Sequence, residues 1–260
     1  MKGEEIGGGV SLTMIIIHSE EELNLIRASS RIVAQVFKEL IKLIRPGITT
    51  GELDETAEEM IREKGGEPAF KGYKGFPATI CASINEEVIH GIPGLRVLKE
   101  GDIISLDMGV KYKGYFGDSA TTVTVGEVSS DIKKLLRVTR QALFEGIKKA
   151  RAGNRLSDIS HAIQSHVEKN GFSVVRDFVG HGIGGSLHEE PQIPNFGRPN
   201  QGPRLKPGMV LAIEPMVNMG NFEVEIKQDN WTAVTCDRQP SAHFEHTVIV
   251  TEDKPEILTM

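Results

Sequence analysis

Apolar residues recur at helical spacing in four stretches of the chain. The first opens at Ser19, where the run Ser-Glu-Glu-Glu ending at Glu22 is a capping-box pattern. The helix should end at Pro46-Gly47, because proline disfavours helical geometry in the residue before it. The apolar positions between these limits are Leu23, Ile26, Val33, Phe37, Leu40 and Ile44. Similar patterns predict helices over about residues 51–64, 131–150 and 157–170.

Strand-like apolar runs lie between and after these helices. Residues 102–112 and 115–125 are separated by Lys113-Gly114, which is the signal of a tight hairpin turn. Residues 209–217, 231–236 and 244–250 also have the pattern of strands. The mixture predicts an α/β (α+β) fold.

The chain also contains a weak internal repeat. Residues 45–65 resemble residues 151–171 at an offset of 106 (151 − 45), and residues 98–107 resemble residues 205–214 at an offset of 107 (205 − 98). Helix–glycine–strand segments can look alike by chance, but an offset that changes by only one residue favours a duplicated half. We therefore expect two related halves.

The repeat has a chemical consequence. Asp107 and Glu214 occupy the same repeat position, and each ends an apolar strand. A pseudo-twofold axis between the halves would bring the two carboxylates towards one central site. This is a natural way to build a two-metal cluster at the junction.

Composition excludes several classes of function. The chain has 260 residues, of which 39% are apolar and 25% charged, as in an ordinary globular protein of one domain. A formal net charge of −6 gives no electrostatic support for nucleic-acid binding. No window approaches 18 uncharged apolar residues, so we expect no transmembrane helix and no membrane partner.

The N-terminus differs from the rest of the chain. Residues 1–13 are rich in glycine and lack the apolar core of a signal peptide, so we expect a flexible extension before a single domain over residues 14–260. Met14 is an alternative start. The expected compartment is the cytoplasm, where Cys81 and Cys236 should be free thiols.

Two acids are expected to be neighbours across the hairpin. Asp107 lies in the apolar run Ile104-Ser-Leu-Asp-Met-Gly-Val110, and Asp118 lies on the partner strand. One alternative is that they are solvated surface acids. However, an unpaired acid in a buried strand is costly, and two close carboxylates repel unless a cation or a proton lies between them. A metal explains the pair better.

Histidines and further acids follow in similar settings. His181 is flanked by glycines, which allow unusual backbone angles and close approach, and His90 opens a related His-Gly-Ile segment. The remaining candidates are His188, Glu214 in Ala212-Ile-Glu-Pro-Met216, and Glu245 before the apolar run 248–250. Singly, each could be an ordinary solvated side chain. Together, oxygen ligands with one or two imidazoles suit Mn, Fe, Co or Zn in a catalytic cluster.

Paired metals would favour amide hydrolysis. Two ions some 3.5–4 Å apart would lower the pKa of a bridging water and polarise a carbonyl oxygen. Aminopeptidases use this chemistry.

These segments resemble the type I methionine aminopeptidases over almost the whole chain from about Met14. The stretches that carry the resemblance are Gly72-Tyr-Lys-Gly-Phe-Pro77, residues 83–93, residues 102–118, Gly180-His-Gly-Ile-Gly184, His188-Glu-Glu-Pro191, Ile213-Glu-Pro-Met216 and Phe244-Glu-His-Thr247. The resemblance implies the pita-bread (creatinase/aminopeptidase-like) fold, in which two pseudo-twofold-related halves surround a curved antiparallel sheet. It implies removal of the initiator methionine from nascent chains when the second residue is small.

The resemblance also assigns roles to residues. The metal ligands would be Asp107, Asp118, His181, Glu214 and Glu245, with Asp118 and Glu245 bridging two ions whose identity the sequence does not give. Glu214 would also move a proton from the bridging water, His90 would contact the scissile amide, and His188 would donate to the developing oxyanion. The methionine pocket would be lined by Tyr73, Phe76, Cys81, Leu187 and Trp231.

Some positions depart from the family pattern. Leu187 stands where an aromatic residue is common, and Phe70 stands where a small residue is common. His243 stands two residues before Glu245, where glutamine is usual. It could point towards the cluster or to the opposite face of its strand, and we expect a supporting or solvent role.

Two alternative functions remain open. One is another pita-bread enzyme such as a prolidase, although prolidases usually carry a longer N-terminal domain. The 25 residues between His188 and Glu214 (214 − 188 − 1) are also too few for the long insertion of type II methionine aminopeptidases. The other is a non-catalytic pita-bread binding protein, which the intact ligand set disfavours. The expected partners are nascent polypeptide N-termini, with transient ribosome association left open, and the expected state is a monomer.

Overall fold

The computed structural model describes residues 14–260, so the predicted flexible extension over residues 1–13 lies outside the described residues. The described helices are α1 (Glu20–Leu40), α2 (Thr50–Glu63), α3 (Ser130–Ile147) and α4 (Leu156–Lys169), with short 3-10 turns η1 (Ile41–Leu43) and η2 (Tyr73–Gly75). The predicted capping box is present, since Ser19 accepts from the Glu22 amide and the Glu22 carboxylate accepts from the Ser19 amide. The first helix is shorter than expected, because a 3-10 turn replaces the α-helix after Leu40.

Strands form one large sheet and two small ones. The large sheet contains β1 (Glu67–Pro68), β2 (Cys81–Ile84), β4 (Ile103–Tyr112), β5 (Tyr115–Thr124), β7 (Val179–Gly182), β8 (Glu189–Pro194), β9 (Val210–Ile213), β14 (Glu245–Ile249) and β15 (Glu256–Ile257). The small sheets contain β6 (Ser173–Val174), β10 (Met216–Asn218) and β13 (Ser241–His243), and β3 (Glu87–Ile89), β11 (Val224–Ile226) and β12 (Ala233–Thr235).

The large sheet has the predicted two-half organisation. Its strand order is β1-β4-β5-β14-β9-β7-β8, with β2 on the outer edge of β4. Around the central β5–β14 pair, β4 and β2 on one side therefore match β9 and β7 on the other. Helix α4 begins and ends 106 residues after α2 (156 − 50 and 169 − 63), which is the offset of the sequence repeat. The repeat thus reflects two structurally equivalent halves.

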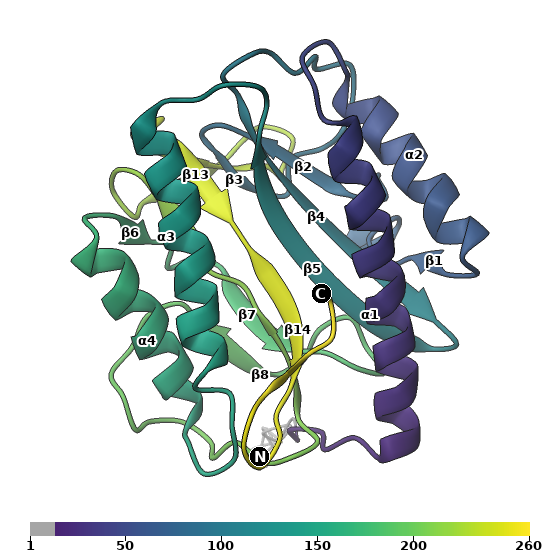
Figure 1. Cartoon of the computed structure of the whole chain (residues 1–260), viewed down its shortest axis with the longest axis vertical. Coiled ribbons are helices and arrows are strands. Elements are labelled where there is room, and N and C mark those ends of the chain that lie inside the picture. Colours follow the sequence, from purple (N-terminus) through teal and green to yellow (C-terminus); the bar gives the residue numbers. More distant parts are fainter. Residues whose placement is uncertain (1–13) are drawn as a thin grey trace, which may run out of the picture.

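Each half has its own apolar core. Helices α1 and α3 lie in front of the central strands, with α2 and α4 to either side (Figure 1). Val33, Leu53 and Leu106 are buried in the core of the first half, and Leu143, Ile163 and Leu211 in that of the second. The helices therefore cover one face of the sheet, and the predicted carboxylates lie on the other face.

One predicted strand is interrupted. The expected strand over residues 209–217 is two strands, because β9 ends at Ile213 and β10 begins at Met216. Pro215 between them has no amide hydrogen to donate to a ladder, and the chain leaves the large sheet for a small one. The expected strand over 244–250 begins after a similar change of sheet, between β13 and β14. Glu214 and Glu245 both lie at these changes.

Candidate metal centre

Three of the predicted ligands surround one small residue of the central strands. Asp107 on β4 is paired in register with Ala120 on β5, and Glu245 on β14 is paired with the same alanine. Asp118 lies two residues before Ala120, on the same face of β5. Paired residues in adjacent strands project to the same side, so the three carboxylates gather around a side chain too small to separate them.

A second alanine occupies a similar position beside the predicted ligands of the other half. His181 on β7 is paired with Ala212 on β9, and Glu214 follows two residues later. The glycines beside His181 are required by packing, because a Cβ on Gly180 would overlap the Ala212 carbonyl oxygen and one on Gly182 would overlap the Glu190 carbonyl oxygen. The sequence pattern around His181 therefore reflects close backbone approach.

The five predicted ligands converge. Asp118, His181 and Glu245, all buried, each offer a donor atom within 4.8 Å of the other two. The His181 Nε2 atom lies 3.7 Å from Oε1 of Glu214. The charges of Asp118 and Glu214 help to raise the pKa of Asp107, which places this carboxylate in the same cluster.

The carboxylates lack the partners that buried charges need. Within the described residues, Oδ1 of Asp107, Oδ1 of Asp118 and Oε1 of Glu245 are buried without a hydrogen-bond partner. Burial, with a contribution from neighbouring carboxylates, raises the pKa of Asp118 to about 8 and the pKa values of Asp107 and Glu245 well above their ordinary range. Burial also raises the pKa of Glu214 to about 7. Native proteins seldom leave such groups unpartnered, and a divalent cation is the partner that fits.

The His181 imidazole also has the hydrogen bond that metal-binding histidines usually make. The Nδ1 atom of His181 lies 2.9 Å from the carbonyl oxygen of Gly182. That contact favours the tautomer with the proton on Nδ1 and leaves the Nε2 lone pair directed towards Glu214, which is the usual arrangement of a metal-binding histidine. Four carboxylates and one imidazole suit a divalent metal ion.

All the predicted site residues line one cavity of about 270 Å³. Besides the four acids and one histidine of the cluster, its lining comprises Tyr73, Phe76, Cys81, His90, His188 and Trp231, together with Phe70, Lys74 and Leu187. Lys74 is the lining residue that was not predicted from the sequence. Its signal was its position inside the Gly72-Tyr-Lys-Gly motif, where it adopts a φ of 50°.

The two remaining histidines pack against different aromatic residues of the cavity lining. His188 stacks on Tyr73 with ring centroids 5.2 Å apart, and its Nδ1 atom lies 3.0 Å from the tyrosine hydroxyl. His90 contacts the edge of Trp231, with centroids 6.4 Å apart. Desolvation by the cavity walls lowers the pKa of His90 to about 4 and, together with the nearby His181, lowers that of His188 to about 3 although part of this residue remains exposed, so both rings are neutral at pH 7 and each can donate one hydrogen bond.

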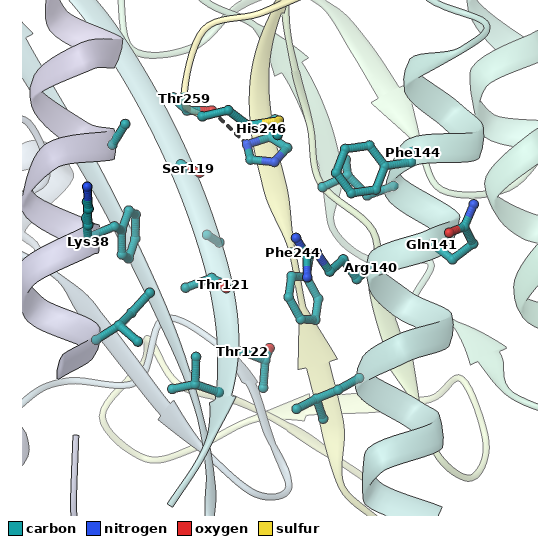
Figure 2. A pocket seen from close by; sticks show the side chains of 18 of the residues that line it. Lys38, Ser119, Thr121, Thr122, Arg140, Gln141, Phe144, Phe244, His246 and Thr259 are labelled. Carbon is teal, nitrogen blue, oxygen red and sulfur yellow. Dashed lines mark hydrogen bonds between the residues drawn. The ribbon is translucent and has the colours of Figure 1, made fainter.

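A larger cavity of about 830 Å³ lies between α1 and α3, on the helix side of the sheet (Figure 2). Ser119 and His246 line it, whereas their strand neighbours Asp118 and Glu245 face the other side because side chains alternate along a strand. No predicted site residue lines this cavity. The chemistry therefore lies in the smaller one.

Comparison with known proteins agrees with this geometry. The profile of metallopeptidase family M24 matches residues 24–252. The chain belongs to metallopeptidase family M24. Among relatives in the family, it is 58% identical to "Methionine aminopeptidase 1" of Bacillus subtilis, over 95% of this chain and 99% of that protein. It is 54% identical to a methionine aminopeptidase of Clostridium perfringens, over 95% and 99% of the two chains.

Solved structures give the same picture. The crystal structure of methionine aminopeptidase from Rickettsia prowazekii superposes with a TM-score of 0.94 at 43% identity, and the match covers 95% of this chain and all of that one. An Xaa-Pro dipeptidase from Bacillus anthracis matches with a TM-score of 0.76 at 24% identity, covering 94% of this chain but only 62% of that one. The second likeness concerns the fold alone, and the shared fold confirms the predicted pita-bread architecture.

His243 is the position where this M24 chain departs from the expected glutamine. It is 1% exposed, and its Nε2 atom lies 3.2 Å from Oε2 of Glu214. The contact lacks hydrogen-bond geometry, and among the described residues neither ring nitrogen has a hydrogen-bond partner. Of the two orientations left open by the sequence, the structure therefore has the one directed at the cluster.

This contact predicts a supporting role that mutation can measure. Replacing His243 with leucine removes the polar neighbour of the Glu214 carboxylate, so we expect kcat to fall about 10–100-fold, the usual effect of losing such support at a metal site. His243→Gln keeps a polar group there and should retain most of the activity. Equal kcat values for the leucine variant and the parent, at equal metal content, would contradict this role.

Proposed function

We propose that this chain removes the N-terminal methionine from polypeptides whose second residue is small, with two divalent metal ions bound by Asp107, Asp118, His181, Glu214 and Glu245. The observation that carries the proposal is the set of buried carboxylate oxygens that, among the described residues, have no hydrogen-bond partner and belong to a cavity also lined by aromatic side chains. Relatives named methionine aminopeptidase match almost the whole chain and support the choice of substrate.

The metal ligands divide between the two halves of the fold. Asp107 and Asp118 come from the hairpin of the first half, and His181, Glu214 and Glu245 come from the second. Asp118 and Glu245 lie on the two central strands, so they would hold the metal between the ligands of the two halves. When bound, two divalent ions supply hydroxide at neutral pH and polarise the carbonyl of the scissile amide.

Three side chains of the cavity would transfer protons, stabilise charge and contact the substrate. Glu214 lies beside His181 and His243 in the cluster, so it would be the carboxylate that takes up and releases the proton of the attacking water. His188, a neutral donor steadied by Tyr73, would stabilise negative charge on the substrate oxygen. His90, beside Trp231, would contact the scissile amide.

The apolar part of the cavity fits a methionine side chain. Phe76 and Trp231 meet edge to face with centroids 5.2 Å apart, and Cys81 is buried beside them. Aromatic walls favour a thioether by burial and by sulfur–aromatic contact. A volume of about 270 Å³ leaves little room for a bulky second residue beside the metal ligands.

A prolidase activity is the alternative within the same fold. It fits less well, because the match covers only 62% of the Bacillus anthracis dipeptidase but 99% of the Bacillus subtilis aminopeptidase. A non-catalytic role has no observation in its favour, since all five ligand positions converge on one site.

The proposed cellular location follows from the substrate. Nascent polypeptide N-termini are formed in the cytoplasm, so we place the chain there. We also propose that it acts as a monomer and that any contact with the ribosome is transient. No helix among residues 14–260 has the length and apolar character to cross a membrane.

Methionine release from short peptides tests the proposal. We expect Met-Ala-Ser to be cleaved at least about 100-fold faster than Met-Leu-Ser, because a mismatch that costs more than about 2.7 kcal/mol in the transition state has this effect. Free methionine is measured with the protein supplied with Mn, Fe, Co or Zn in turn. Equal rates for the two peptides would contradict the second-residue preference, and cleavage of Xaa-Pro dipeptides alone would favour the prolidase alternative.

A further inference from the structure

A second groove opens from the mouth of the catalytic cavity. It has a volume of about 450 Å³, and Lys74, His181 and His188 line both spaces. The groove is therefore continuous with the site. Its other lining residues come from strands β7 and β8 and from the segment before α1.

The segment before α1 gives this groove an apolar wall. Met14 and Ile16 line it with 82% and 43% of their surfaces exposed, and Val179 of β7 lies in the same lining. The lining also includes Glu190 and Gln192. Exposed apolar side chains gathered beside an active site are typical of a binding surface.

The apolar wall is firmly attached to the domain. The His18 amide donates to the Gly208 carbonyl oxygen at 2.9 Å, and His18 Nε2 lies 3.4 Å from the buried carboxylate of Glu189, next to His188. Two glycines make room for the segment, because a Cβ on Gly184 would overlap the His18 ring and one on Gly208 would lie 2.8 Å from Ile17. The loop that carries His188 and the segment that carries Ile16 are thus packed together.

The direction of a bound peptide places its later residues in the groove. The methionine end of the cavity is closed by Phe76 and Cys81, which are 4% and 3% exposed. A polypeptide held there by its first residue must leave past the exposed His188, which is where the groove begins. Extended chain advances about 3.3–3.6 Å per residue, so the third and fourth residues are the first to lie beyond the site.

We infer that Met14 and Ile16 form a specificity surface that binds apolar side chains at the third and fourth residues of the substrate. This inference rests on the proposed methionine aminopeptidase function and extends it from the first two residues to the next two. The chemistry is burial of apolar substrate side chains against Met14 and Ile16. The preferred substrates are nascent chains of the form Met-small-apolar-apolar.

Paired peptides measure the preference. The full chain is assayed with Met-Ala-Leu-Leu-Ser and Met-Ala-Ser-Ser-Ser, and the ratio of their kcat/KM values is determined. We expect a ratio of about five to ten in favour of the leucine peptide, carried by KM, as partial burial of two leucines predicts. In the double variant Met14→Ser, Ile16→Ser the ratio should fall to about one.

A matched control separates the groove from general effects on the segment. Ile17 is 50% exposed and adjacent to Ile16, but it does not line the groove, so Ile17→Ser should keep the ratio of the parent. A parent ratio near one, or a double variant that keeps the parent ratio, would overturn the inference while leaving the proposed function intact. Failure to release methionine from either peptide would instead reject the proposed function itself.

Discussion

Replacing His181 or Asp107 with alanine is expected to lower the rate of methionine release by more than about 100-fold while the protein keeps its fold. Loss of a group that merely supports a ligand costs about 10–100-fold, and loss of the ligand itself must cost more. Both side chains face a cavity and contribute little to the apolar cores of the two halves. The measurements are kcat/KM on Met-Ala-Ser, metal content of the purified protein, and thermal unfolding.

His246→Ala is the matched control for the ligand variants. His246 lies next to Glu245 on β14, but its side chain lies on the helix face, where Nδ1 is 2.8 Å from the Thr259 hydroxyl (Figure 2). This variant should keep its metal content and most of its activity. Near-parental activity in His181→Ala or Asp107→Ala, with metal still bound, would refute the ligand assignment.

The hairpin pair of acids could be predicted because a tight turn fixes register. Lys113 and Gly114 both adopt positive φ, and Tyr112 pairs with Tyr115, as a two-residue turn requires. The register then places Asp107 and Asp118 on one face, two positions apart in pairing. Local sequence was sufficient here, since the contact spans only eleven residues (118 − 107).

The second half of the site could be predicted in outline from the repeat. Glu214 takes the position equivalent to Asp107, because β9 and β4 occupy equivalent places on either side of β5 and β14. The repeat did not reveal that the strand ends at Ile213. Nothing in one half indicates that Pro215 sends the chain into a different sheet in the other, because the corresponding residue after Asp107 continues β4.

The contact of His243 with Glu214 needed the structure. It depends on the pairing of β13 with β10, in which His243 lies opposite Met216. The two strands meet outside the large sheet, where β10 follows β9 and β13 precedes β14, and no short-range pattern encodes that meeting. The groove wall formed by Met14 and Ile16 was hidden for the same reason, because the sequence indicates an apolar segment there but not the surface it covers.

Removing the metal should make the stability of the protein depend on pH in a direction that identifies the cluster. The folded-state pKa values of Asp118 and Glu214 are about 8 and about 7, above the ordinary values of about 4 for these groups in an unfolded chain. Between those limits the folded protein binds more protons than the unfolded one, so the free energy of unfolding decreases as pH rises. The contribution of these two groups to the free energy of unfolding is fully present below about pH 4 and is lost as pH rises towards 8.

We therefore expect chelated protein to be inactive and its Tm to fall by several degrees between pH 5.5 and pH 8, since each kcal/mol corresponds to about 2–4 °C for a chain of this size. Metal-loaded protein should not show this fall, because bound cations keep the carboxylates ionised in the folded state and replace the protons. Thermal unfolding with and without Mn, across this pH range, measures the difference.

Two variants provide the controls. Asp118→Asn removes one of the titrating groups and should flatten the dependence of the metal-free Tm on pH. Asp131→Asn changes an exposed residue at the start of α3 and should leave that dependence unchanged. A metal-free Tm that is constant or rises with pH would mean that the four carboxylates are not gathered as the structure places them, because close buried acids without a cation must favour the protonated form.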